Sequence, residues 1–381
     1  METVEITSKG FEKLRRGEVW IYNKEIESIP SVKVGSIATL TFKSKPYALA
    51  FINPLSKITA RVLTFNINET IDKKFFEKRI KNAIDRRKTI KNTDAFRLIH
   101  AEADNLPGLI VDKYADHLVV SFDSAGINNF REIIIQILKN MLKPSVVYER
   151  ANPSATKEGL TNASRTIYGT LKENLTITEE NKSFFITIKE GQKTGFYLDQ
   201  RKNRSIIATL KPKKLLDLFA YSGGFGIRAN ADFTKFVEIS DRNCQLIEKN
   251  CKLNKLKNYQ IINDNVFDFL EKETARYDTI VIDPPPFAKN KKAVNNAIKA
   301  TTFLIDRALK LLENNGFLAI FSCSKAVGYN ELLLAALKAS TKNSCRLETI
   351  AYLKQDIDHP SIINIPSSHY LSGFLFRKIQ L

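Results

Sequence analysis

Cysteine is scarce in this sequence, and its spacing excludes several classes of site. The 381 residues include only four cysteines, at positions 244, 251, 323 and 345, with no CxxC pair. Such spacing argues against a disulfide framework, a zinc site and an iron–sulfur cluster. The four histidines, at 100, 117, 359 and 369, show no ligand spacing either. We therefore expect a protein that holds no metal.

Long apolar runs are also missing. No run approaches the roughly 20 residues that span a bilayer, and the first residues, METVEITSKGFEKL, lack the apolar segment of a signal peptide. Hydrophobic residues make up 43% and charged residues 26% of the chain, as in ordinary globular proteins. The sequence predicts a cytoplasmic protein of two or three domains that does not enter a membrane.

Acidic residues are outnumbered, with 41 against 59 basic residues and a net charge of +18. A basic surface gains affinity for polyanions because it releases counterions from phosphates. A concentrated basic amphipathic helix, which would favour a membrane surface, does not stand out. The charge favours a nucleic-acid partner, and the alternative is a lysine-rich composition spread over every surface.

The most informative stretch is 215–228, LLDLFAYSGGFGIR. An apolar run ends at Asp217, a turn contains Ser222, Gly223 and Gly224, and a segment compatible with a helix follows. Glycines let a loop approach a ligand closely, and the helix behind it favours polar or anionic groups. Because Phe219 and Tyr221 occupy the places of the first glycines in GxGxxG, an ordinary βα turn is an equal alternative for this stretch alone.

Three later strands strengthen the interpretation, since each ends in a reactive side chain. The segments KFVEIS, YDTIVIDPP and GFLAIFSCS end near Glu238, Asp283 and Cys323. Ligands of open α/β sheets bind at the carboxyl ends of the strands. We therefore expect Asp217, Glu238, Asp283 and Cys323 to meet in one crevice of an α/β sheet, whereas each residue alone could be a cap or a packed thiol.

Four motifs resemble one enzyme family. KEGQKTGFYLDQRKNR (189–204), DLFAYSGGFG (217–226), DPP (283–285) and SCS (322–324) resemble class I S-adenosylmethionine-dependent 23S rRNA methyltransferases. The nearest members carry an N-terminal PUA domain and form 5-methylcytosine. The likeness runs over essentially the whole chain and implies three parts. These are a small β-barrel PUA domain, a central α+β (ββαββ) domain and a Rossmann-like domain with a doubly wound seven-stranded sheet.

Local patterns set the expected boundaries of these domains. Short apolar runs between turn residues predict the PUA-like RNA-binding β-barrel at 1–70, and a helical linker with a solvated charged face follows at 71–95. The central domain spans 96–188. It is expected to have a helix over Ile127–Leu142 that buries Met141, to be completed by strands near LTITEE and KSFFITIKE, and to carry a mobile substrate-facing loop at 152–160. The methyltransferase domain takes 189–381.

The resemblance also implies which residues hold S-adenosylmethionine. Glu238 would bind the ribose hydroxyls, either Asp264 or Asn265 the adenine amine, with Asp264 preferred, and Asp217 would orient the first loop near the methionine end. The other expected cofactor contacts are Phe219, Tyr221, Ser222, Gly223, Gln200, Arg201 and Asp283.

Cytosine chemistry, in the same resemblance, would depend on Cys323 and Asp283. Carbon 5 of cytosine is a poor nucleophile, and attack by a thiolate at carbon 6 activates it. Lys325 lies two residues after Cys323, and a nearby cation favours a thiolate. Asp283 could hold the cytosine amine and ring nitrogen of a target that has left its base stack.

RNA contacts are expected mainly from the N-terminal domain. The candidates are Lys9, Lys13, Arg15, Arg16 and, outside that domain, Lys193. Trp20, the only tryptophan, is expected to pack in the core rather than stack on a base. The expected partner is 23S rRNA or a precursor of the large ribosomal subunit, and a homodimer stays open.

Three departures from the family pattern leave two alternatives open. Pro286 follows Asp-Pro-Pro where relatives have lysine, Lys299-Ala300-Thr301-Thr302 replaces Arg-Gly-Tyr-Lys, and Lys325 replaces a glycine. One alternative is methyl transfer to a base nitrogen, which commonly uses an aromatic residue where Pro286 stands; Phe287 comes one position late. The other is a non-catalytic RNA-binding or ribosome assembly factor, against which the retained Asp217, Glu238 and Cys323 argue.

Overall fold

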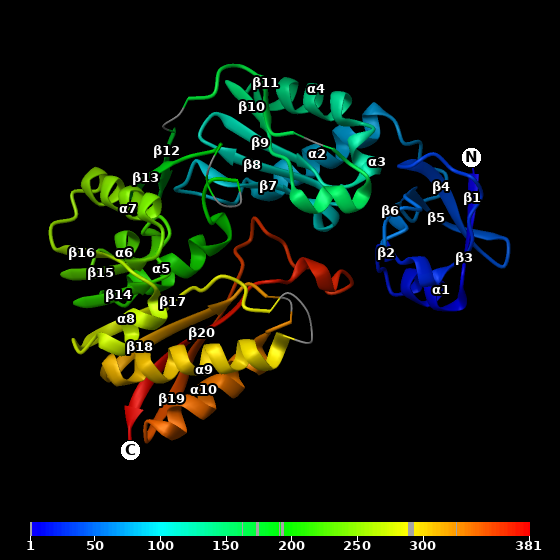
Figure 1. Ribbon diagram of the computed structural model, residues 1–381. Helices are drawn as coiled ribbons and strands as arrows, with labels where there is room; N and C mark the ends of the chain where they lie inside the picture. The colour runs from blue at the N-terminus through cyan, green and yellow to red at the C-terminus, as the bar shows by residue number, and fades with distance from the viewer. Residues whose placement is uncertain are drawn as a thin grey trace. The chain divides into compact units, whose positions relative to one another are not determined.

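The computed structural model describes residues 2–161, 163–172, 175–189, 191, 194–288, 293–324 and 326–381. The chain divides into two compact units (Figure 1). Unit 1 comprises 1–180, 186–195 and 357–369, and unit 2 comprises 181–185, 196–356 and 370–381. The expected methyltransferase domain, 189–381, therefore gives residues 189–195 and 357–369 to unit 1, a difference that the sequence did not indicate. No helix of the described residues is long and apolar enough to cross a membrane.

The first part of unit 1 is a six-stranded sheet in the order β2-β6-β5-β4-β1-β3. One helix, α1, follows β1, and the Thr7 side chain caps it by accepting a hydrogen bond from the backbone N–H of Gly10 at 3.2 Å. Alternate residues of the strands, such as Val4, Ile6 and Leu40, form the core. The bounds are β1 (Glu2–Ile6), α1 (Ser8–Arg15), β2 (Trp20–Ile21), β3 (Ile26–Ser28), β4 (Ser36–Phe42), β5 (Lys45–Ile52) and β6 (Ala60–Thr64).

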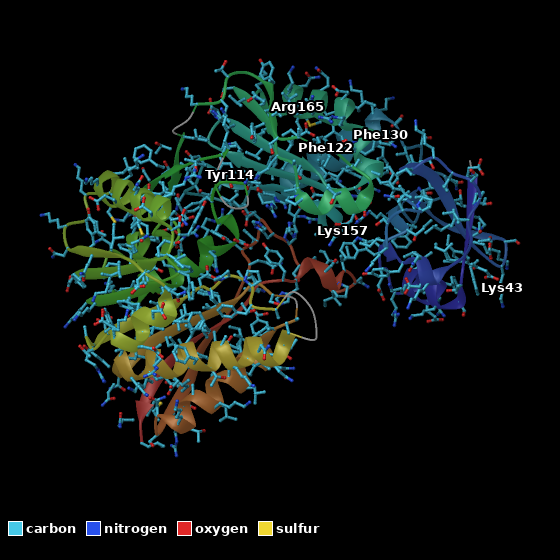
Figure 2. The ribbon with its side chains drawn as sticks, viewed as in Figure 1. Lys43, Tyr114, Phe122, Phe130, Lys157 and Arg165 are labelled. Carbon is cyan, nitrogen blue, oxygen red and sulfur yellow. The ribbon has the colours of Figure 1, made fainter. Side chains whose placement is uncertain are left out.

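The second part of unit 1 is a five-stranded sheet in the order β11-β10-β9-β8-β7. Phe122 of β9 and Phe130 before α4, both labelled in Figure 2, belong to its side-chain packing. The same apolar cluster includes Phe51 of β5 and Phe76 of α2, so the two sheets share a core. The bounds are α2 (Lys73–Arg87), β7 (Ala95–His100), β8 (Leu109–Tyr114), β9 (His117–Phe122), α3 (Ala125–Asn128), α4 (Arg131–Leu142), β10 (Val146–Glu149) and β11 (Arg165–Tyr168).

Several expectations for this part need correction. The strand that completes the sheet is β11; β12 (Leu175–Glu179) and β13 (Lys182–Ile186) lie outside it. The helix expected over 127–142 is two helices, and Met141 is 39% exposed. The segment 152–160, whose mobility stays a prediction, contains a 3₁₀ helix, η3 (Pro153–Glu158), with Glu158 buried. The charges of α2 are not all solvated, since Arg87 is only 3% exposed.

Unit 2 contains a seven-stranded sheet in the order β16-β15-β14-β17-β18-β20-β19. All neighbours are parallel except those of β20, which runs antiparallel to β18 and β19. The strands are β14 (Lys214–Leu218), β15 (Phe233–Glu238), β16 (Tyr259–Asn263), β17 (Tyr277–Ile282), β18 (Leu312–Ser322), β19 (Cys345–Lys354) and β20 (Ser372–Gln380). The doubly wound sheet that the sequence predicted is confirmed.

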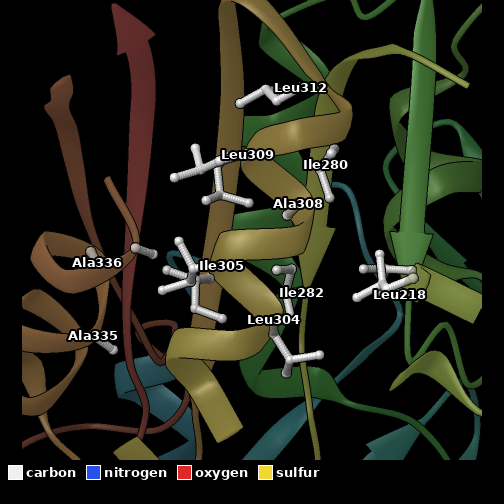
Figure 3. Close-up of a cluster of buried hydrophobic side chains, with 14 of the residues drawn as sticks. Leu218, Ile280, Ile282, Leu304, Ile305, Ala308, Leu309, Leu312, Ala335 and Ala336 are labelled. Carbon is white, nitrogen blue, oxygen red and sulfur yellow. The ribbon is translucent and has the colours of Figure 1, made fainter. Parts of the chain in front are cut away.

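Helices cover both faces of this sheet because its strands are apolar on both faces. Leu218, Ile280 and Ile282 face α8, α9 and α10, and Figure 3 shows Leu304, Ile305 and Leu309 of α9 in this layer. Leu215, Val281 and Phe321 pack on the opposite side with residues of α5 and α6. The helices are α5 (Arg201–Thr209), α6 (Gly224–Ala229), α7 (Asp241–Leu253), α8 (Val266–Lys272), α9 (Val294–Leu311) and α10 (Tyr329–Lys342).

Candidate active site

The loop between β14 and α6 has an unusual backbone. Phe219 and Tyr221 have φ values of 61° and 52°, in the left-handed region that side chains other than glycine rarely adopt. Gly223 has φ 77°, and a Cβ there would come within 2.9 Å of the Ile227 side chain. A left-handed conformation and a close approach thus require glycine at 223, while Phe219 and Tyr221 are held against their preference, as is common in ligand-binding loops.

Asp217, at the end of β14, binds the first turn of the helix that follows this loop. Its side chain is 1% exposed, and Oδ2 accepts a hydrogen bond from the backbone N–H of Gly226 at 2.9 Å. Burial raises the pKa of Asp217 to about 8, and the charges of Asp283 and Glu238 add to this increase. The predicted role in orienting the loop is consistent with this geometry.

Glu238 binds the same loop from the next strand. Oε2 accepts a hydrogen bond from the backbone N–H of Tyr221 at 2.9 Å, and Oε1 accepts from the backbone N–H of Ser240 at 3.0 Å and from Asn243 Nδ2 at 3.2 Å. The carboxylate is 7% exposed. It lies at the carboxyl end of β15, beside the loop, where an acid can bind the hydroxyls of a nucleoside.

Asp264 and Asn265 follow β16, and the structure separates their roles. The Asn265 side chain accepts a hydrogen bond from the backbone N–H of Phe267 at 2.8 Å and caps α8. The side chain of Asp264 is 37% exposed, with Lys272 Nζ at 3.9 Å. Because the amide of Asn265 is used by the helix, Asp264 is the better candidate for an adenine amine.

Asp283 and Gln200 form a hydrogen-bonded pair. Gln200 Nε2 donates to Asp283 Oδ2 at 3.0 Å, and Gln200 Oε1 accepts from Asn203 Nδ2 at 2.6 Å. Gln200 is 2% exposed, so it orients the Asp283 carboxylate directly after β17. Gln200 thus lies at the predicted crevice. Its contact with Asp283 could not be predicted from the GQKTGFYLDQR motif.

Tyr197 is a candidate site residue that the sequence analysis missed. Burial raises the pKa of Tyr197 well above its usual range, and the charges of Asp283, Tyr221 and Cys323 act in the same direction. Its ring meets that of Tyr221 at a centroid distance of 5.1 Å. Tyr197 could have been found from the sequence, because it lies in GQKTGFYLDQR, three residues before Gln200, which was already an expected cofactor contact.

Arg201 has a mainly structural position. Its guanidinium lies 2.7 Å from Asp356 Oδ2, and both residues are less than 9% exposed. This ion pair joins α5 to the chain that follows β19.

Ser222 is one of the residues predicted to contact the cofactor from the loop between β14 and α6. It is 3% exposed, and its carbonyl accepts a hydrogen bond from Asn250 Nδ2 at 3.1 Å.

Cys323 follows β18 directly and is partly exposed, whereas Cys244, Cys251 and Cys345 are buried. Its Sγ lies 3.9 Å from the carbonyl oxygen of Pro284, in the turn that starts at Asp283. Ser324 anchors this turn by donating to the carbonyl of Ala288 at 2.7 Å. The thiol and the Asp283 carboxylate therefore share one end of the sheet. Lys325, the expected cation, lies outside the described residues.

The predicted RNA contacts differ in accessibility. Lys9 is exposed, and the side chains of Arg15 and Arg16 are each 65% exposed. Lys13 disagrees with the prediction: it is 13% exposed, and its Nζ lies 3.1 Å from both Glu25 Oε2 and the carbonyl of Trp20. Internal ion pairing explains Lys13 better than RNA binding does. Lys193 lies outside the described residues.

Comparisons with known proteins agree with this architecture. A PUA-like domain matches residues 4–65, and the family described as Conserved hypothetical protein 95 matches residues 165–329. The crystal structure of SMU.776, complexed with SAH, superposes with a TM-score of 0.86 over 99% of this chain and all of that one, at 23% identity. This likeness shows the fold.

Curated relatives extend the match to the whole chain. Ribosomal RNA large subunit methyltransferase I of Aeromonas salmonicida is 34% identical over 97% of this chain and 98% of its own length. The protein of that name from Tolumonas auensis is 33% identical over the full length of both. This chain belongs to the ribosomal RNA large subunit methyltransferase I family.

Proposed function

We propose that this protein transfers the methyl group of S-adenosylmethionine to carbon 5 of a cytosine in 23S rRNA, with Cys323 as the nucleophile. The observation that carries the proposal is a partly exposed thiol at the carboxyl end of the sheet, 3.9 Å from the carbonyl oxygen of Pro284, the residue after Asp283. Family membership supports the broader activity, an rRNA methyltransferase, and the thiol supports the cytosine product.

The residues at the strand ends fit the cofactor. Glu238 has the position for the ribose hydroxyls and Asp264 for the adenine amine, while the loop 219–223 lets the backbone approach closely. When bound, S-adenosylmethionine supplies an electrophilic methyl group. Glu238 is held by neutral N–H donors, so its carboxylate suits a ligand with hydroxyl groups or a positive charge. Asp217, whose raised pKa favours the protonated form, holds the start of α6.

The thiolate of Cys323 adds to carbon 6 of the cytosine, and the displaced electron pair moves to carbon 5. Carbon 5 then takes the methyl group as the methyl–sulfur bond of the donor breaks, and the sulfur leaves with the bonding electron pair as a neutral thioether. Loss of the carbon-5 proton to a base returns an electron pair, the carbon–sulfur bond breaks, and the thiolate and the aromatic ring are restored. Asp283, oriented by Gln200, accepts a hydrogen bond from the cytosine amine and holds carbon 6 near the sulfur.

Methyl transfer to a base nitrogen fits the site less well. Phe287, the aromatic residue nearest in sequence to Asp283-Pro284-Pro285, lies 6.0 Å from Phe267 between ring centroids and belongs to a packed aromatic group. Phe267 also lies 5.7 Å from Phe303. A ring engaged in this packing is a poor platform for a flipped base, which supports the cytosine-5 assignment.

The test is a covalent trap. RNA with 5-fluorocytosine at the target has no carbon-5 proton to lose, so methyl transfer should leave wild-type protein linked to RNA on a denaturing gel. Cys323→Ala should give neither product nor adduct. Cys345→Ala is the matched control: Cys345 is buried, burial raises the pKa of its thiol, and the variant should still form the adduct.

Other outcomes separate the alternatives. A nitrogen methyltransferase would stay active as Cys323→Ala and form no adduct. An RNA-binding assembly factor would bind the RNA and show neither activity nor adduct. Methyl transfer by Cys323→Ala at the wild-type rate would overturn the proposal.

A further inference from the structure

The chain makes an excursion between the last two strands that builds part of unit 1. After β19 it supplies residues 357–369 to that unit and then returns as β20. Asp358, which is fully buried, anchors the excursion: its carbonyl accepts from Arg87 Nη2 at 2.8 Å, and its Oδ2 accepts from the backbone N–H of Arg97 at 2.9 Å. The excursion is therefore a fixed part of unit 1.

The far end of the excursion reaches the first sheet. Asn364 Nδ2 donates a hydrogen bond to the carbonyl of Arg16, the C-cap of α1. A cavity of about 130 Å³ lies between these segments, lined on one side by Trp20 and Tyr22 and on the other by Asn364, Ile365 and Pro366. Its two walls are more than 340 residues apart in the chain.

Two aromatic side chains give the cavity its chemistry. Trp20 is held in place, because its Nε1 donates to Glu102 Oε1 at 2.8 Å and the Arg61 guanidinium lies 5.3 Å from its ring centroid. Tyr22 is 37% exposed, and Lys13 Nζ lies 4.4 Å from its ring centroid. An apolar cavity of roughly 150 Å³ admits a benzene ring, so this cavity suits one planar ring.

Basic side chains outnumber acidic ones around the cavity. Arg16, whose side chain is 65% exposed, lies where Asn364 docks, and it forms an ion pair at 3.2 Å with Glu18, an acid of the cavity lining. Lys24, two residues after Tyr22, is exposed, as is Lys57, whose carbonyl accepts from the backbone N–H of Asn23 at 3.2 Å. Aromatic side chains within a cationic groove are the arrangement that binds single-stranded nucleic acid, since bases stack on the rings and phosphates meet the cations.

We propose that this cavity, the Trp20–Tyr22 pocket, binds one unpaired nucleobase of the RNA substrate. The proposal rests on the proposed function for the presence of an RNA substrate, and it adds a second base-binding position remote in sequence from Cys323. Asn364 lines the cavity and donates from Nδ2 to the Arg16 carbonyl, so its amide oxygen is the group offered to the edge of the base. Trp20, for which core packing was expected in preference to base stacking, is fixed by Glu102 and also forms part of the pocket wall.

Tyr22→Ala in the full-length protein tests the pocket. Affinity for a fluorescein-labelled single-stranded oligouridylate, measured by anisotropy, should fall about tenfold, within the range for loss of one base stack. Tyr22→Phe should bind like wild type because the ring is kept. Tyr168→Ala is the matched control: Tyr168 is 44% exposed with Lys139 Nζ 4.1 Å from its ring, lies outside the pocket, and should leave the affinity unchanged.

Trp20 offers a direct readout, because it is the only tryptophan in the chain. Oligouridylate should quench its fluorescence, whereas inorganic polyphosphate, a polyanion without bases, should bind the cations without that quenching. Equal quenching by both polymers, or wild-type affinity in Tyr22→Ala, would overturn the proposal. Failure of the 5-fluorocytosine adduct with intact quenching would instead count against the proposed chemistry alone.

Discussion

Buried carboxylates are held in different ways in the two units. In unit 1, Asp104 accepts two hydrogen bonds from Arg87 at 2.7 Å, and Asp112 accepts from Arg97 at 2.7 and 2.8 Å. In unit 2, Asp217 and Glu238 are comparably buried, but their hydrogen-bond partners among the described residues are backbone N–H groups and the Asn243 amide. One set is neutralised by arginine, and the other is hydrogen-bonded by neutral donors.

We infer from this difference that the arginine-paired acids serve the fold and that the acids at the strand ends serve a ligand. An arginine fork satisfies a carboxylate in both charge and geometry and leaves little for a ligand. A carboxylate held by neutral donors stays costly to ionise when buried, as the raised pKa of Asp217 shows. A cationic ligand or a set of hydroxyl groups at the strand ends would relieve that cost.

The largest effect is expected from breaking an arginine pair. Arg87→Met leaves Asp104 buried without its main partner, which should lower the free energy of unfolding of unit 1 by about 3–5 kcal/mol. Urea denaturation followed by Trp20 fluorescence measures this unit. Arg86→Met is the control: Arg86 also contacts Asp104, at 2.9 Å, but its side chain is 44% exposed, so the loss should stay below about 1 kcal/mol. Equal losses would contradict the comparison.

An effect of similar size but opposite kind is expected at Asp217. Its pKa of about 8 in the folded protein exceeds its ordinary value of 3.8, so the folded chain keeps a proton that the unfolded chain loses. Stability from this group is complete below about pH 4 and is lost as the pH rises through about 8, by about 1.4 kcal/mol per pH unit within that window.

Asp217→Asn should therefore flatten the pH dependence of the free energy of unfolding while keeping an acceptor for the Gly226 N–H. Urea titrations at about pH 5 and about pH 7.5 measure the change. Asp232→Asn, at an exposed position, should retain the wild-type slope. A slope that Asp217→Asn leaves intact would mean that another group titrates.

Glu238 tests the ligand side of the comparison. Glu238→Ala should weaken S-adenosylmethionine binding by roughly 1–3 kcal/mol, the range for a polar group left without its partner, as measured by calorimetry. Glu238→Gln keeps one acceptor oxygen for the Tyr221 N–H and should lose less. Glu271→Ala, which removes an acid 3.8 Å from Arg307 on the surface, should bind normally. Wild-type affinity in Glu238→Ala would place the cofactor elsewhere.

Sequence patterns could predict the strand-end acids because a buried parallel strand is a continuous apolar run, and the residue after it necessarily lies at the ligand-binding edge. The same patterns could not place Arg87 in the core, since a lysine- and arginine-rich helix is typical of a solvated face. They also could not bring Asn364 next to Arg16, because that contact depends on an excursion whose anchor, Asp358, binds residues more than 250 positions away.

The smallest effect concerns the basic side chains of the first part of unit 1. The exposed ones are expected to bind RNA, and the one paired inside the protein is expected to stabilise the fold. Arg15 and Arg16 are solvent-exposed, and their replacement together by alanine should weaken RNA binding. The slope of log affinity against log salt should fall by about 0.7 for each phosphate of a single strand that the variant no longer neutralises. Lys13→Met is the contrast: its Nζ is bound by Glu25, so stability should fall while the salt slope stays the same. If the double arginine variant kept the wild-type slope, or Lys13→Met changed it, the phosphates would be bound at another surface.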